Sequence, residues 1–217
     1  MLELIKKDIL LSKKQILIIL SLNIVIPFFM MYVNDGESVP TSILLPPLLL
    51  LLGTTYCANV FEEEEKNKDA TKFLITLGYT RKELVLHYYV ALYLAILTGL
   101  VIVETIALID HRFDFVQFHD LLRTLSLVNI ACGLFLHVSI KKGYSIGRIV
   151  FGIIILLIST APTIITTLIK KNDIQFDLVG YLNQNTNTIL YVVFAVSVLF
   201  LYMLIRLSVK SFEQKDL

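Results

Sequence analysis

Residues whose types could support chemistry are few and widely separated in this chain. Four consecutive glutamates, Glu62 to Glu65, form the densest acidic cluster, and the two cysteines, Cys57 and Cys132, stand far apart. Adjacent glutamates occur in glutamate-type intramembrane proteases, but no arginine follows them here at the E-E-x-x-x-R spacing. The cysteines fit no metal-ligand or disulfide pattern, and no G-x-x-x-x-G-K-[ST] nucleotide-binding motif occurs. We therefore predict no catalytic residue and no metal site.

The composition indicates a bilayer as the surrounding solvent. Hydrophobic residues make up 56% of the 217 residues, charged residues only 17%, and the mean hydropathy is +0.77. A span needs about 20 apolar residues, and a helix satisfies its own backbone groups in lipid. We predict an all-α membrane protein with six transmembrane helices, at about 15–33, 42–60, 86–109, 121–140, 149–169 and 188–207.

The distribution of lysine and arginine predicts the orientation of these spans. The first, third, fifth and last polar segments hold 15 of the 19 basic residues, whereas the alternate segments hold three and Arg123 lies just inside the fourth span. Basic residues gather on the cytoplasmic side of membrane proteins. Both termini are therefore predicted to be cytoplasmic, and the chain is expected to be a multi-pass protein. With a net charge of +1 and no basic domain, no nucleic-acid partner is expected.

Polar residues inside the spans are candidates for a transport pathway. Glu104 is the only acidic residue within a predicted span, and an intramembrane ionisable group is a functional hypothesis by default. It lies near the outer end, where pairing with Arg123 or His111 gives an alternative, structural interpretation. Asn23 and Asn129 lie near the middle of spans one and four. They could line a pathway or form hydrogen bonds between helices.

The segment 61–85 carries much of the charge between spans two and three. We predict a helix that begins at Glu62 to Glu65, because carboxylates favour the positive end of a helix dipole. Phe73, Leu74 and Leu77 are predicted to share its apolar face.

Capping signals predict how this segment joins the third span. Gly78 occupies the position of a C-terminal cap, and Thr80 with Glu83 forms a capping-box pattern. A second helix should thus begin near Arg81 and continue into the membrane, which makes the segment a helix–turn–helix corner. The alternative interpretation is a solvated, charge-stabilised loop.

The first 14 residues have the pattern of an interfacial helix. Leu2, Ile5 and Ile9 form one apolar stripe, with four lysines largely elsewhere. Such a helix would lie on the anionic inner leaflet. The alternative is a frayed basic tail that only contributes orientation charge.

These features resemble small ABC-2-type permeases, the membrane subunits of ATP-driven exporters, and are similar to those of bacitracin-resistance and phenol-soluble-modulin export systems. The resemblance rests on "LELIKKDILLSKKQILIILSL" and on "FEEEEKNKDATKFLITLGYTRKELVLHYYVALYL". The matching positions of the second motif are Phe61, Glu65–Lys66, Asp69–Thr71, Leu74–Leu77 and Arg81–Glu83. Two positions depart from it, since many relatives have proline near Gly78–Tyr79 and lysine near His87.

The resemblance implies roles for both cytoplasmic segments. Residues 1–14 would be the elbow helix and 61–85 the coupling segment that fits into a groove of the ATPase. The implied ATPase-coupling residues are Lys72, Phe73, Leu74, Leu77, Thr80, Arg81, Lys82 and Glu83.

The resemblance also implies partners and cargo. ATP and magnesium would bind two copies of a separate cytoplasmic ATPase, with no cofactor in this chain, and a second permease copy would complete a homo- or heterodimer. The expected complex lies in a bacterial plasma membrane and exports an amphipathic or hydrophobic compound, such as a membrane-active peptide or antibiotic. The alternative is a secondary transporter, which would need coupling charges or broken helices near the midplane.

Overall fold

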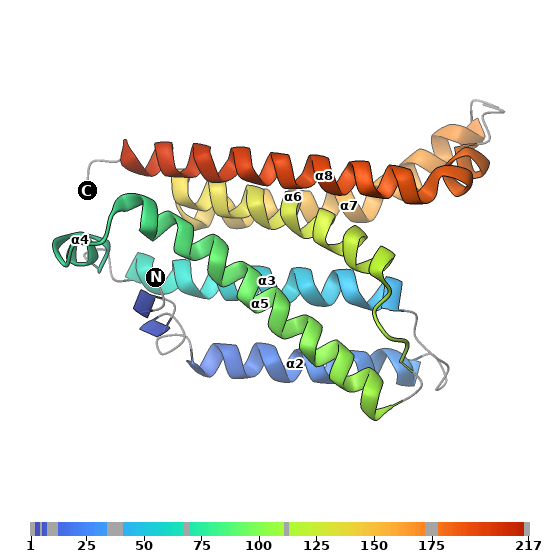
Figure 1. Cartoon of the computed structure of the whole chain (residues 1–217), viewed down its shortest axis with the longest axis horizontal. Coiled ribbons are helices and arrows are strands. Elements are labelled where there is room, and N and C mark those ends of the chain that lie inside the picture. The colour runs from blue at the N-terminus through green and yellow to red at the C-terminus, as the bar shows by residue number, and fades with distance from the viewer. Residues whose placement is uncertain are drawn as a thin grey trace.

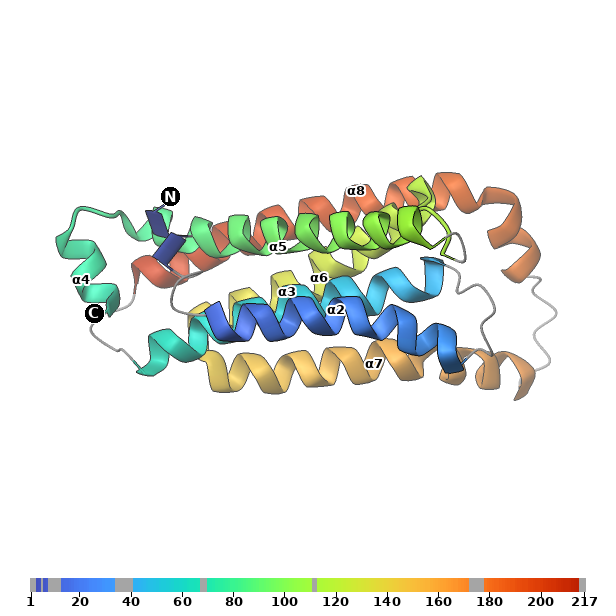
Figure 2. The same cartoon turned by 90° about the horizontal axis from the view of Figure 1, so that it is seen from below.

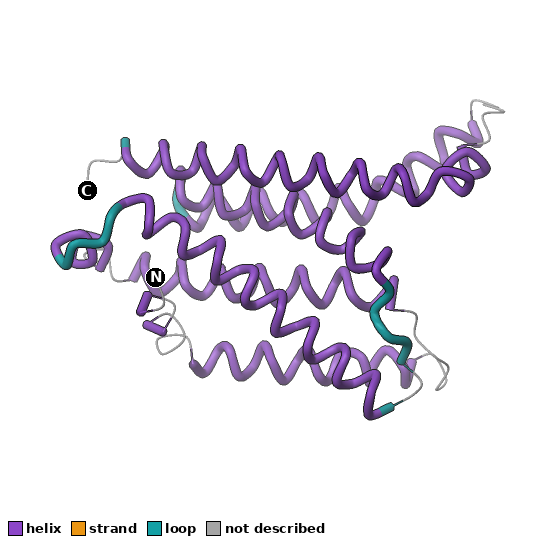
Figure 3. Tube along the Cα trace, viewed as in Figure 1, coloured by secondary structure: helices purple, strands orange, loops and turns teal. Residues whose placement is uncertain are grey.

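The computed structural model describes residues 3–4, 6–7, 13–33, 41–66, 70–110, 113–171 and 178–214, and helices dominate this part of the chain (Figures 1 and 3). The helices lie side by side as an elongated bundle, with the short α4 at one end. Their bounds are α2 Lys13–Val33, α3 Thr41–Lys66, α4 Ala70–Thr76, α5 Arg81–Ile109, α6 Phe118–Lys142, α7 Tyr144–Lys171 and α8 Leu178–Glu213.

Four helices of the described chain are long and apolar enough to cross a membrane. They lie in α3, α5, α6 and α8, over Leu44–Glu62, Arg81–Ile109, Phe118–Lys142 and Asn187–Glu213. The apolar stretches of α2 and α7 among the described residues are shorter, at Leu20–Phe29 and Tyr144–Leu157. The helical class is therefore confirmed, while the six-span topology stays a prediction. The elbow helix falls largely outside the described residues.

The core of the bundle is built on α3, α5 and α6. Its best buried side chains include Leu45, Leu92 and Leu136, one from each of these helices. Gly53 of α3 faces the Leu92 side chain, and Gly99 of α5 faces that of Leu49. These reciprocal contacts let the two backbones approach closely, as small residues do between helices in membranes.

Figure 2 shows how the remaining helices surround this core. Helix α8 lies along α5 and α6, while α7 lies on the other side, next to α3 and α6. Both described ends of the chain, near Glu3 and Gln214, lie at the end of the bundle occupied by α4 (Figure 1). This common location determines the surroundings of the predicted coupling residues.

Candidate functional site

The corner between α3 and α5 begins differently from the prediction. Helix α3 continues to Lys66, so Glu62 to Glu65 lie in its last turns and do not start the coupling helix. The prediction from the helix dipole was wrong because aromatic packing and helix propensity both favour a longer α3. Phe61 stacks on Tyr88 of α5 with ring centroids 4.7 Å apart, and glutamate has a high helix propensity.

Helix α4 ends in the cap that the sequence predicted at Gly78. This glycine has a φ of +94°, which a residue with a Cβ rarely adopts. Its N–H donates to the carbonyl of Ile75 at 3.0 Å, and the N–H of Tyr79 donates to that of Leu74 at 3.2 Å. These two bonds form a Schellman motif. They fix the direction in which the chain leaves α4.

Helix α5 begins with the predicted capping box. The N–H of Glu83 donates to Thr80 Oγ1 at 3.2 Å, and the N–H of Thr80 donates to Glu83 Oε2 at 2.8 Å. Only Leu77 to Thr80 separate the two helices. Because one capping motif ends α4 and another starts α5, the corner holds α4 in a defined position on a long helix of the bundle.

The apolar residues of α4 divide between two faces. Leu74 is buried, and packs in one cluster with Leu4 and Leu84. Phe73 and Leu77 point outward, with 62% and 59% of their surfaces exposed. The predicted single face was therefore wrong for Leu74. Successive residues of a helix point about 100° apart, so Leu74 can face Leu4 and Leu84 while Phe73 points outward.

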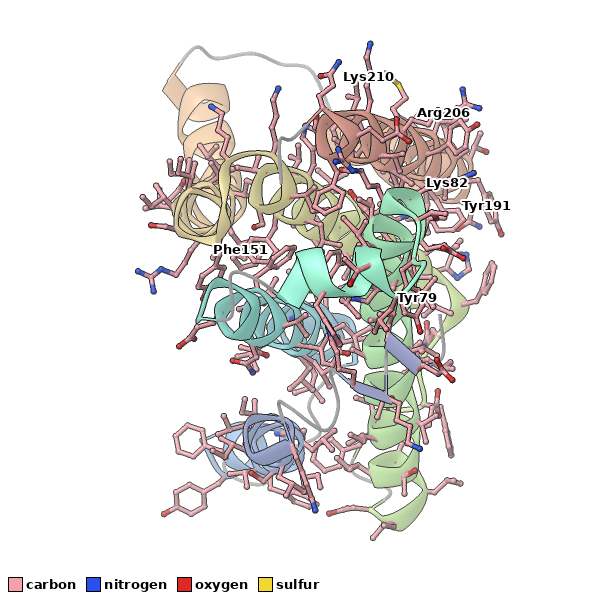
Figure 4. The ribbon with its side chains drawn as sticks, turned by 90° about the vertical axis from the view of Figure 1, so that its left-hand side faces the viewer. Tyr79, Lys82, Phe151, Tyr191, Arg206 and Lys210 are labelled. Atoms are coloured by element: carbon pink, nitrogen blue, oxygen red, sulfur yellow. The ribbon has the colours of Figure 1, made fainter. Side chains whose placement is uncertain are left out.

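The charged coupling residues also differ in their surroundings. Arg81 donates from its guanidinium to the backbone carbonyls of Phe212 and Glu213, so it satisfies the C-terminal end of α8. Lys82 is exposed at the same end of the bundle (Figure 4). The side chain of Lys72 lies outside the described residues, although its backbone belongs to α4. Of the two coupling cations whose side chains the structure describes, Arg81 bonds to α8 and Lys82 faces outward.

The beginning of the chain also reaches this corner. Tyr79 donates its hydroxyl to Glu3 Oε2 at 2.9 Å, and this bond to a carboxylate raises the pKa of Tyr79 above its ordinary value. Leu4 is almost completely buried against Leu74. Together with Arg81 and α8, these contacts bring both ends of the sequence onto the α4–α5 corner. Sequence reasoning missed them because they join residues far apart in the chain.

Asn129 lies inside the bundle and connects three helices. Its side-chain oxygen accepts from the hydroxyl of Tyr93 in α5, and its nitrogen donates to Ser197 Oγ in α8 at 3.1 Å. Ser197 in turn donates to the carbonyl of Phe194 at 2.7 Å. This arrangement agrees with the interpretation that Asn129 forms hydrogen bonds between helices.

A second polar contact among these helices was not predicted. Ser208 Oγ lies 2.9 Å from the hydroxyl of Tyr89 and 3.0 Å from His137 Nδ1. Its own proton donates to the carbonyl of Leu204 at 2.7 Å, so the other two groups act as donors. A signal was present in the sequence, since Tyr89 lies one helical turn before Tyr93 and Ser208 lies three turns after Ser197.

Glu104 and Asn129, two of the three predicted pathway residues, have separate hydrogen-bond partners in the structure. Glu104, partly buried near the end of α5, accepts a hydrogen bond from the N–H of Val116 at 3.1 Å. Arg123, its proposed partner, lies 3.7 Å from Asp120. Asn23 belongs to α2, and its side chain lies outside the described residues. The contact of Glu104 holds the connection between α5 and α6.

This contact predicts the result of changing Glu104 to glutamine. The amide oxygen of glutamine can still accept from the N–H of Val116, so we expect expression and transport near those of the unmodified protein. Transport and membrane abundance should be measured together. Loss of transport at normal abundance would contradict the structural role and make Glu104 part of the pathway.

The geometry and the comparisons together define the class of the protein. It is a multi-helix membrane protein with a capped helical corner at one end of its bundle. A family model described as ABC-2 family transporter protein matches residues 3–213, almost the whole chain. The chain belongs to this family, and is therefore a membrane subunit of an ABC transporter, a class that works with an ABC ATPase. It matches no curated protein and no solved structure.

Proposed function

We propose that the chain is the permease subunit of an ABC exporter, and that α4 and the start of α5 dock onto the ATPase. The observation that carries this proposal is the pair of exposed apolar side chains, Phe73 and Leu77, on a helix held by two capping motifs. Exposed aromatic and aliphatic side chains in aqueous surroundings are typical anchors of protein interfaces. Lys82 supplies an exposed positive charge in the first turn of α5.

The corner is suited to transmit movement into the membrane. Because α5 begins at Arg81 and continues without a break to Ile109, a displacement of α4 displaces a whole spanning helix. The packing of Leu74 on Leu4 would extend the movement to the beginning of the chain, and the hydrogen bond from Arg81 to the carbonyl of Glu213 would extend it to α8. ATP and magnesium would act on the two ATPase copies, and this chain would contribute the coupling surface.

The proposed complex pairs this permease with a second copy or a related chain in a bacterial plasma membrane. An amphipathic or hydrophobic cargo, such as a membrane-active peptide or antibiotic, is supported by the apolar character of the bundle. The cargo would enter from the cytosol or the inner leaflet.

Copurification tests the central step of this proposal. Affinity purification of the full-length chain from its native membrane, in a mild detergent, should retain an ATPase subunit whose hydrolysis increases in the complex. Transport driven by an ion gradient, in a preparation that contains no ATPase, would contradict it and favour a secondary transporter.

The six-span topology is tested with fusions. A reporter that is active only outside the cytoplasm should be active after Glu37 or Asn172 and silent after Asp69 or Lys215, because the basic residues are expected to remain inside. Activity of the fusion after Lys215 would contradict six spans with both ends in the cytoplasm.

A further inference from the structure

Two basic residues near the C-terminal end of α8 lie on its outer surface. Arg206 and Lys210 are both exposed and are one helical turn apart, and Tyr202 precedes them by another turn. Viewed from the α4 end, both cations lie on the outer side of α8 (Figure 4). Neither forms an ion pair with a residue that the structure describes. This surface of α8 therefore presents two positive charges that the described part of the chain does not neutralise.

The guanidinium of Arg206 leans toward the membrane interior. It lies over the ring of Tyr202, 4.8 Å from the ring centroid, in a cation–π contact. Side chains of a helix point back toward its N-terminus, and in the proposed topology α8 runs toward the cytoplasm with its span ending at about 207. The cation thus lies inside the span, where headgroups meet hydrocarbon. A basic residue near the end of a spanning helix usually extends away from the hydrocarbon instead.

Arg148 of α7 provides a contrast on the same side of the membrane. Its guanidinium lies 6.0 Å from the ring centroid of Tyr144, with the same i, i+4 spacing. Helix α7 begins in the cytoplasm in the proposed topology, so the same lean toward the N-terminus carries Arg148 away from the hydrocarbon. The two arginines therefore differ in depth, although both lie over a tyrosine one turn before them.

The depth of Arg206 limits what can neutralise it. A cytosolic protein does not reach below the headgroups. A second copy of this chain offers no carboxylate there, since Glu104, its only acidic residue within a predicted span, lies near the outer end. The phosphate of a phospholipid lies at this level and accepts two parallel hydrogen bonds from a guanidinium. Lys210, about 6 Å further toward the cytosol, then faces the rest of the headgroup.

We propose that Tyr202, Arg206 and Lys210 form a binding site for one anionic phospholipid of the inner leaflet. Arg206 binds its phosphate, Tyr202 holds the guanidinium in place, and Lys210 favours a headgroup with net negative charge. The choice of leaflet rests on the proposed topology. Such a lipid fixes the depth of α8, whose last turn bonds to Arg81 at the corner between α4 and α5.

The sequence contains no tryptophan, which allows a direct test. Tyr202→Trp keeps an aromatic ring beside Arg206 and introduces a single fluorophore that brominated lipids quench on contact. The full-length variant is placed in vesicles of phosphatidylcholine and phosphatidylglycerol, with bromine near the glycerol end of the acyl chains of one lipid at a time. Phosphatidylglycerol should be enriched at the site at least about fivefold over its bulk fraction, the effect expected of one basic residue at an anionic surface.

Charge variants of this reporter identify the cation responsible. Arg206→Gln should remove most of the enrichment and Lys210→Gln part of it, whereas the matched control Arg148→Gln should leave it unchanged. A reporter at the exposed Tyr191, near the other end of α8, should show no preference between the lipids. Equal quenching by both lipids at position 202, or equal losses in the Arg206 and Arg148 variants, overturns the proposal. Quenching by neither lipid also overturns it, because a protein chain then covers the site.

Native mass spectrometry provides a second measurement that does not depend on the tryptophan. Phosphatidylglycerol should stay bound to the unmodified chain and to Arg148→Gln, and should be lost from Arg206→Gln. Retention by Arg206→Gln would contradict the site. These measurements need neither ATP nor an ATPase, so a negative result leaves the proposed function intact, and a failure of ATPase docking leaves the lipid site intact.

Discussion

Replacement of both Phe73 and Leu77 by alanine is expected to leave the permease folded in the membrane and to release its ATPase. Both side chains are largely exposed and make no contribution to the clusters that hold α4 in place. An interface anchor contributes at least about 2 kcal/mol, which corresponds to roughly thirtyfold in affinity. The loss is measured as ATPase retained on the purified permease and as stimulated ATP hydrolysis.

Two control variants separate docking from stability. Leu199 and Met203 of α8 have the same i, i+4 spacing and similar exposure, 65% and 59%, so their double alanine variant should keep the ATPase bound. Leu74→Ala removes a buried side chain and should loosen the corner itself. Normal coupling by the Phe73 and Leu77 variant would show that this surface of α4 does not dock the ATPase.

Gly147→Ala is expected to destabilise the bundle by about 1–3 kcal/mol, the usual effect of overpacking. Helices α6 and α7 are joined through Gly143, whose φ is +95°. A Cβ on Gly147 would lie 3.0 Å from the Cβ and 3.2 Å from the backbone Cα of Ser139. Rotation of the serine hydroxyl cannot relieve these two contacts, so the helices must move apart.

The matched control for this variant is Gly152→Ala in the same helix. A Cβ there has nothing within 4 Å, and alanine is favoured over glycine in a helix by up to about 1 kcal/mol. Both variants are unfolded in mixed micelles by titration with a denaturing detergent. The two titrations give the difference in their free energies of unfolding. Equal stability of the two variants would contradict the close packing of α6 on α7.

Local sequence signals predicted the caps of the corner between α4 and α5. They did not predict the partners of Leu74 and Arg81, which lie far away in the sequence. The caps at Gly78 and Thr80 depend on residues within one helical turn, so a single sequence is sufficient to find them. The burial of Leu74 depends on Leu4, 70 positions earlier, and Arg81 bonds to carbonyls of α8 more than 130 positions later. No local pattern encodes such partners.

The same limit applies inside the bundle. Asn129 was a candidate from its residue type and depth, but the hydroxyls of Tyr93 and Ser197 that satisfy it lie on other helices. Glu104 was identified as unusual, yet its partner is a backbone N–H of Val116, which no side-chain pattern could reveal. The sequence did not predict that α3 continues to Lys66, because the packing of Phe61 on Tyr88 outweighs the preference of glutamates for the start of a helix.

The location of the last described residue, Gln214, has a consequence for protein engineering. It lies at the same end of the bundle as α4, on which the ATPase is proposed to dock (Figure 1). An ATPase joined genetically after Gln214 would therefore start beside its own docking surface, and a short flexible linker would give it a high effective concentration there. Permease and ATPase could in this way be produced as one polypeptide with a fixed one-to-one ratio.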